Sequence, residues 1–199
     1  MRPGGGAQKG AKFERDTGRI LSRWLTNGDR HDLFSRNVLS GGAFTSATRR
    51  GLKTSRAPGD LMSAHPAAFG FLDVYMVECK HHADLQLDLL FYDGKNSRLG
   101  RIVSYAQLQA DQSSKKPFIV VKENRRDPLL ILNGRDGRRI MTALQTARRP
   151  RFLRSHSFEN GSMWFTDLYK FLELVNPPLL LLEAHHAPHH GSTPDPQAG

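Results

Sequence analysis

The spacing of apolar residues predicts a helix over residues 12–27. Its apolar positions recur at helical intervals and are Phe13, Ile20, Leu21, Trp24 and Leu25. The pair Asn27-Gly28 follows directly and supplies a stop signal. The start of the chain therefore folds as an amphipathic helix.

Charged residues on this helix add two features to the apolar pattern. Arg15, Arg19 and Arg23 are four residues apart and form a basic stripe on another face. Glu14 instead aligns with the apolar side of the helix. Two interpretations explain Glu14: a flanking charge with a buried stem, or a carboxylate held inward for chemistry.

The rest of the pattern predicts strands and helices in mixed order. Residues 60–64 and 72–80 are expected to form two strands joined by a turn around His65-Pro66 and Gly70. The later elements expected are a helix over 98–114, strands over 117–123 and 128–132, and helices over 139–148 and 165–175. This order predicts an α/β domain with a central mixed β-sheet flanked by helices.

The two ends of the chain differ from the middle in composition. Of the 199 residues, 11–182 suit a single domain, whereas the Gly-rich residues 1–10 are expected to be flexible. Residues 183–199 contain three prolines and no large apolar residue, which predicts a disordered tail. The sequence HHAPHH in that tail is interpreted as a transition-metal ligand set or as incidental histidines.

Several sequence features bear on location. No apolar run approaches the roughly 18 residues that a membrane span needs. The first ten residues lack the apolar stretch of a secretory signal, and Cys79 has no second cysteine to pair with. We therefore expect a cytoplasmic protein with no membrane partner, in the host cytoplasm if a phage encodes it.

The charge balance favours a polyanionic partner. The chain has 29 Lys and Arg against 19 Asp and Glu, a net charge of +10. Residues 41–59 are small, polar and glycine-punctuated, and their basic members are Arg49, Arg50, Lys53 and Arg56. This composition predicts a mobile basic loop that orders against phosphate backbone, although a merely solvated loop explains it equally well.

The segment LDVYMVECK carries the candidate chemistry. Strand alternation places Met76, Glu78 and Lys80 on one face, with Cys79 on the other. Antiparallel pairing with the preceding strand would bring Asp60 beside Glu78. Two convergent carboxylates form a hard oxygen site suited to Mg²⁺, and a neighbouring lysine can polarise an attacking water. These parts are sufficient to hydrolyse a phosphodiester, whereas an isolated Glu-x-Lys pair is usually only a solvated ion pair.

The order Glu14, then Pro58-Gly59-Asp60, then Glu78-Cys79-Lys80 resembles the PD-(D/E)xK nuclease superfamily, which has the restriction-endonuclease-like fold. Within it, the chain is most similar to archaeal-type Holliday junction resolvases and their phage relatives. The segments that carry this likeness are Lys9-Gly10-Ala11-Lys12-Phe13-Glu14-Arg15 and Arg36-Asn37-Val38-Leu39-Ser40-Gly41-Gly42. One departure is Pro-Gly-Asp in place of Pro-Asp, which is tolerable if the carboxylate still points inward.

The resemblance implies roles for individual residues. Asp60 and Glu78 would bind Mg²⁺, with Mn²⁺ as an alternative, and the backbone carbonyl of Cys79 would be a third ligand. Lys80 would activate or position the attacking water, and Glu14 would support the metal site or bind the metal. The phosphate backbone would be held by Arg15, Arg36 and Ser40. Weaker candidates, for which a surface position is an equally good or better account, are His81, His82, Gln107 and Gln109.

The leading hypothesis is therefore a Mg²⁺-dependent endonuclease that cuts branched DNA as a homodimer, in phage recombination or a related process. A nuclease acting on linear duplex or single-stranded DNA would need the same motif residues. A non-catalytic DNA-binding module on the same fold is a further alternative. RNA binding has only the charge in its favour, because no aromatic ribonucleoprotein signature is present.

Overall fold

The structure, a computed structural model, describes residues 5–37, 58–85, 87, 98–146, 154–158 and 161–181. Its centre is a five-stranded mixed sheet with the strand order β3-β4-β5-β7-β6. In chain order the strands are β3 (Tyr75–His82), β4 (Lys116–Glu123), β5 (Leu129–Asn133), β6 (Arg154–Phe158) and β7 (Gly161–Asp167). Only the β3–β4 pair is parallel, so the sheet is mixed, as the sequence predicts, and β3 lies at one of its edges.

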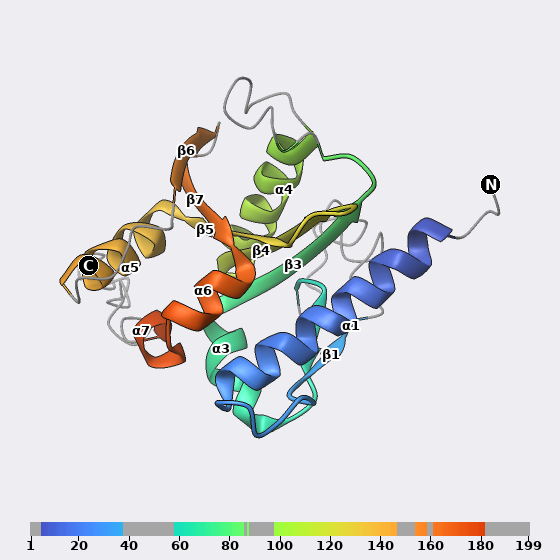
Figure 1. The fold of residues 1–199 in the computed structure, drawn as a ribbon, viewed down its shortest axis with the longest axis horizontal. Coiled ribbons are helices and arrows are strands. Elements are labelled where there is room, and N and C mark those ends of the chain that lie inside the picture. The colour runs from blue at the N-terminus through green and yellow to red at the C-terminus, as the bar shows by residue number, and fades with distance from the viewer. Residues whose placement is uncertain are drawn as a thin grey trace, which may run out of the picture.

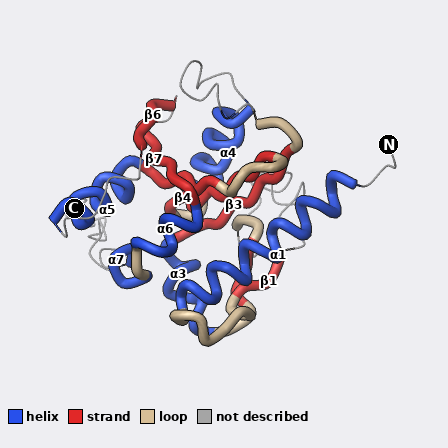
Figure 2. The backbone as a smooth tube through the Cα atoms, viewed as in Figure 1, coloured by secondary structure: helices blue, strands red, loops and turns tan. Residues whose placement is uncertain are grey.

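A second, two-stranded sheet pairs β1 (Phe34–Arg36) with β2 (Leu61–Ser63) in antiparallel register. The helices are α1 (Gly5–Leu25), α3 (Phe69–Val74), α4 (Arg98–Gln112), α5 (Gly134–Thr146), α6 (Leu168–Leu174) and α7 (Pro177–Leu181), with a 3₁₀ turn, η1, at Pro66–Ala68. In Figure 1, α1 runs alongside β1 and β3, while α4 lies on the other side of the sheet. Figure 2 shows the same separation of helices and strands.

Alternation along β3 divides the core into two layers. Tyr75, Val77 and Cys79 face the larger cluster, which also contains the buried side chains of α1, α3, α5, α6 and α7. Met76 faces the smaller cluster, which is built mainly from α4 and the other faces of β4 and β5. The face assignment made from the sequence is therefore confirmed for the residues of β3. No helix in the described ranges is both long and apolar enough to cross a membrane.

Four sequence-based boundaries are wrong. The helix predicted over 139–148 is α5 and begins at Gly134. Residues 72–74 belong to α3, because Pro66 starts a helical turn and Phe71 packs against Tyr75 with ring centroids 5.2 Å apart. Residues 165–167 end β7, so the last predicted helix begins only at Leu168. α1 begins at Gly5, so residues 5–10 are helical rather than irregular.

The predicted pairing of residues 60–64 with the strand that carries Glu78 is also wrong. β2 pairs with β1 instead, and β1, β6 and β7 were not predicted at all. The helix over 98–114 and the strands over 117–123 and 128–132 are confirmed, within a few residues, as α4, β4 and β5. Most of the basic loop over 41–59 and the tail over 183–199 lie outside the described residues.

A buried ionic cluster ties the beginnings of β3 and β4 to α5. The Asp136 carboxylate, only 1% exposed, accepts hydrogen bonds from Lys116 Nζ at 2.9 Å and from Tyr75 Oη at 3.0 Å. Asn133 Nδ2 donates to it at 3.0 Å, and an Arg139 guanidinium nitrogen lies 3.6 Å away. The cluster holds the first residue of β3 in place. It therefore helps to set the register of the whole strand, including its last residues.

We expect Asp136→Asn to lower the free energy of unfolding by about 3 kcal/mol, because it leaves buried cations without their anion. Chemical denaturation measures this loss. The matched control is Asp127→Asn in the exposed β4–β5 turn, which should change stability by less than about 0.5 kcal/mol. Equal effects from the two variants would contradict a stabilising role for the cluster.

Candidate active site

The segment that carries Asp60 lies against the outer edge of β3, opposite the edge that pairs with β4. The backbone N–H of Asp60 donates to the Val77 carbonyl at 2.7 Å. Its carboxylate oxygen Oδ2 accepts the N–H of Cys79 at 2.8 Å and Lys80 Nζ at 3.1 Å. Asp60 therefore contacts β3 as the sequence predicts. The contact is made by this loop and not by an antiparallel hairpin.

Gly59 makes this approach possible. Its φ is +88°, in the left-handed region, and a Cβ atom there would lie 2.7 Å from the Val77 carbonyl oxygen and 2.9 Å from Met76 Cγ. Asn37, which is buried, holds the segment from the other side: its N–H donates to the Asp60 carbonyl at 2.8 Å and its Nδ2 to the Gly59 carbonyl at 2.9 Å. The inserted glycine is thus what lets the carboxylate point inward.

Glu78 and Lys80 project from the same face of β3. Glu78 is only 3% exposed, and Lys80 Nζ lies 2.5 Å from its carboxylate, so the ammonium contacts both Glu78 and Asp60. Burial, and then the charge of Asp60, raises the pKa of Glu78 to about 7 despite the opposing effect of Lys80. Burial acts to lower the pKa of Lys80, but the charges of Glu78 and Asp60 outweigh it and raise this pKa.

Glu14 faces the same site from α1. Its carboxylate is bound by Arg36 Nε from β1, and it lies close enough to Asp60 and Lys80 to feel both charges. Burial raises the pKa of Glu14, while the hydrogen bond from Arg36 acts against this rise. The inward orientation expected for Glu14 is therefore present, with Arg36 as its immediate partner.

The carboxylates form a donor set with an excess of negative charge. Glu14, Asp60 and Glu78 share two cationic partners, Lys80 and Arg36. Within the described residues, no three His, Cys, Asp or Glu side chains form a ready metal-binding group. Asp60 and Glu78 nevertheless fit Mg²⁺, which prefers a few carboxylate oxygens and keeps most of its waters. Burial and the charge of Asp60 both raise the pKa of Glu78, and a bound cation would oppose both effects.

The thiol of Cys79 takes no part in this donor set. It is 3% exposed and faces the larger core cluster, and burial raises its pKa well above the usual range. A protonated buried thiol is neither a nucleophile nor a metal ligand. Only the backbone of Cys79 is therefore available to the site.

The other residues predicted for the site do not all lie beside Asp60, Glu78 and Lys80. Arg15 and Arg36 line a pocket next to it, whereas Ser40, Arg49, Arg50, Lys53 and Arg56 lie outside the described residues. The His81 ring forms a hydrogen bond with Asn124 at 3.1 Å. It also contacts the Phe13 ring in a tilted arrangement, with centroids 5.6 Å apart, and so packs next to the helix residue that precedes Glu14. Gln107 bonds to Asp111 at 2.7 Å on α4, but Gln109 is buried, so its expected surface position is wrong.

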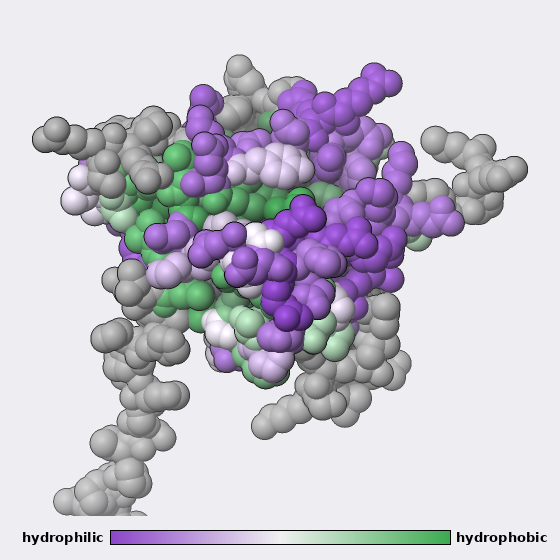
Figure 3. All heavy atoms as spheres, turned by 60° about the horizontal axis from the view of Figure 1, so that its bottom comes forward, coloured by the Kyte–Doolittle hydropathy of each residue, from purple (hydrophilic) through white to green (hydrophobic). Residues whose placement is uncertain are grey.

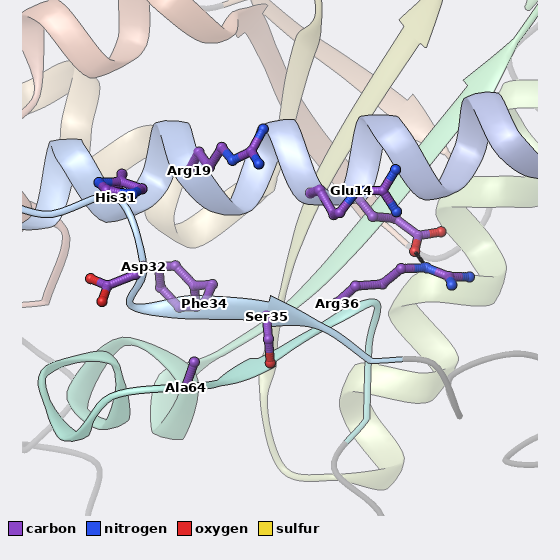
Figure 4. Close-up of a pocket in the computed structure, with 9 residues that line it drawn as sticks. Glu14, Arg19, His31, Asp32, Phe34, Ser35, Arg36 and Ala64 are labelled. Carbon is purple, nitrogen blue, oxygen red and sulfur yellow. Dashed lines mark hydrogen bonds and ion pairs between the residues drawn. The ribbon is translucent and has the colours of Figure 1, made fainter.

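The pocket has a volume of about 400 Å³ and lies between α1 and β1. Figure 4 shows Glu14 and Arg36 facing each other at one end, with His31 and Asp32 at the other and Arg19 between them on α1. The sequence analysis did not assign His31, Ser35 or Arg19 to a site, nor Asn37 to a supporting role. For Arg19 a signal was available, because it follows Arg15 by one helical turn.

Gly59→Ala should destabilise the protein more than Gly28→Ala, which is matched for backbone conformation. Both glycines have a positive φ, but a Cβ at Gly28 would meet nothing within 4 Å. We expect both changes to cost roughly 1–2 kcal/mol for the left-handed backbone and Gly59→Ala a further 1–3 kcal/mol for overpacking against β3. Thermal and denaturant unfolding of the two variants measure the difference, and equal losses would contradict the close approach.

Comparison with known proteins agrees with this arrangement. The family described as "Phage putative PDDEXK endonuclease" matches residues 6–177, which includes every described residue of the site. No curated protein and no solved structure matches the chain. The letters in the name of this family correspond to the residue types of Asp60 and of Glu78-Cys79-Lys80. With most of its length matched, the chain belongs to the phage PDDEXK endonuclease family.

Proposed function

We propose that this chain is a divalent-metal-dependent DNA endonuclease whose reaction centre is formed by Asp60, Glu78 and Lys80. The observation that carries the proposal is the contact of one ammonium with two buried carboxylates, 3.1 Å from Asp60 and 2.5 Å from Glu78. Membership of an endonuclease family and the net charge of +10 support a nucleic-acid substrate.

Asp60 and Glu78 would hold the cation, for which we propose Mg²⁺, with Mn²⁺ as an alternative. The Cys79 carbonyl would join them, because in an extended strand the N–H and C=O of one residue point to the same edge, and this N–H already bonds Asp60. A cation held there would stabilise negative charge developing on the phosphate and favour ionisation of the attacking water. The proposed reaction breaks one P–O ester bond and yields a phosphomonoester and a hydroxyl.

Lys80 would activate or position the attacking water. As an ammonium in contact with both carboxylates, it can donate hydrogen bonds to the water and to a phosphate oxygen. Glu14 would support the site by holding Arg36, whose guanidinium is in turn near enough to contact a phosphate.

For the substrate we propose branched DNA, cut by a homodimer in the manner of a Holliday junction resolvase, in the cytoplasm of a phage host. Support comes from the two segments that resemble those resolvases, which contribute Glu14, Arg15 and Arg36 to one site in the structure. Two strands cut symmetrically require two sites, and a two-fold dimer supplies them.

Glu78→Gln should reduce cleavage of a labelled four-way junction in Mg²⁺ by at least about 100-fold, because it removes a negative charge at the reaction centre. Binding of the same junction, measured in EDTA, should be retained. Glu173→Gln on the exposed side of α6 is the matched control and should cleave normally. Cleavage retained by Glu78→Gln would overturn the assignment of the site.

The same assay includes a linear duplex and single-stranded DNA. Paired symmetric nicks in the junction alone are expected for a resolvase. Metal-dependent cleavage of the linear or single-stranded substrate would keep the reaction centre but make the protein a general nuclease. Tight binding without cleavage of any substrate would favour the non-catalytic DNA-binding module.

Mg²⁺ should stabilise the folded protein by mass action, by about 2.7 kcal/mol at a free concentration about 100 times its dissociation constant. Asp60→Asn and Glu78→Gln should each abolish most of this shift because each removes a proposed ligand. Thermal unfolding with and without Mg²⁺ measures it, with Asp127→Asn as a control that keeps the shift. Equal shifts in all variants would place the cation elsewhere.

A further inference from the structure

The pocket between α1 and β1 is lined by Glu14 and Arg36 (Figure 4) and adjoins the reaction centre, since Glu14 lies close enough to Asp60 and Lys80 to feel both charges. Arg15 and Arg19 lie one helical turn apart on α1 and form one wall. Ser35 and Arg36 from β1 form the facing wall, and His31 lies at the far end. The pocket therefore begins at the reaction centre and extends along α1.

The carboxylates of the pocket have partners of their own. Asp32 is held by both Arg30 Nε at 2.9 Å and an Arg30 terminal nitrogen at 2.8 Å, and Glu14 is held by Arg36. Among the residues that the structure describes, no ion pair involves Arg15. Arg19 makes a single long contact, 3.5 Å, with Asp16. Arg15 and Arg19, both exposed, thus line the pocket without a short ion pair of this kind.

The rest of the lining is apolar. Phe34 is 7% exposed and meets the pocket together with Ala64 from the segment after β2. Figure 3 shows strongly hydrophilic side chains gathered over the centre and right of the molecule, with paler residues below them. Positive charge on the α1 wall and the small apolar surface of Phe34 and Ala64 suit a phosphate joined to a sugar, at a volume typical of small-molecule sites.

We propose that this pocket binds a backbone phosphate of the substrate strand close to the cut, with Arg15 and Arg19 on the phosphate and the deoxyribose against Phe34 and Ala64. The inference rests on the proposed nuclease function and extends it, because neither Arg19 nor the apolar wall belongs to the motif. Arg19 is a positioning residue: it fixes the path of the strand leading to the reaction centre and touches no reacting atom.

The test is a double-mutant cycle in which one change is a substitution in the protein and the other is a neutralised phosphate in the DNA. Uncharged methylphosphonate linkages replace single phosphates along one strand of a four-way junction, and dissociation constants are measured in EDTA for wild type, Arg19→Ala and Arg23→Ala. Arg23 is the matched control, an exposed arginine on the same helix that does not line the pocket. Wild type should lose about fivefold to tenfold in affinity at one internal linkage near the cut.

Arg19→Ala should bind the unmodified junction about fivefold to tenfold more weakly and be insensitive to the methylphosphonate at that linkage. For this variant, the slope of log affinity against log salt concentration should become less steep by about one. Arg23→Ala should keep the wild-type pattern. Equal sensitivity of Arg19→Ala and wild type at every linkage would overturn the proposal, and so would a response only at a terminal phosphate, which would indicate binding of a DNA end.

Cleavage is measured separately, in Mg²⁺ on the unmodified junction. A wild type that shows the Arg19-dependent linkage but does not cleave would overturn the nuclease function and leave the pocket assignment intact. A wild type that cleaves normally while no linkage depends on Arg19 would do the reverse. Failure to bind DNA would overturn both.

Discussion

The site depends on the contact between the Asp60 segment and the free edge of β3. Two hydrogen bonds make it, from the Asp60 N–H to Val77 and from the Cys79 N–H to the Asp60 carboxylate. They satisfy backbone groups of an edge strand that would otherwise need solvent or another chain. The same bonds place the Asp60 carboxylate beside Glu78 and Lys80. The contact that covers the edge of β3 therefore also assembles the site.

This arrangement concentrates charge where burial makes it costly. Asp60 and Glu78 are each no more than 5% exposed, and the raised pKa of Glu78 reflects burial together with the neighbouring aspartate. An ionised Glu78 carboxylate therefore lowers the stability of the folded protein unless a cation or a proton binds to it. Loss of stability at residues needed for activity is common in enzymes. The tightly packed layers on both sides of β3 hold the carboxylates in place against this repulsion.

Prediction from sequence succeeded where a local pattern was sufficient. The strands near residues 117–123 and 128–132 are continuous apolar runs, and both are confirmed as interior strands of the sheet. Residues 72–74 were misassigned because short apolar segments fit helix and strand equally well, and packing of Phe71 among aromatic rings decided for helix. The end of β7 was taken for helix because it runs directly into α6 without a break.

The sequence by itself determined which residues are candidates for the chemistry and, through alternation, which side of β3 Glu78 and Lys80 occupy. It also indicated that Glu14 leans inward. Only the tertiary structure decided how they meet: Gly59 passing against the β3 backbone, Arg36 holding Glu14, and the pocket beside them. Local periodicity reports the face of one element, whereas these contacts join elements far apart in sequence, whose pairing depends on the packing of the whole domain.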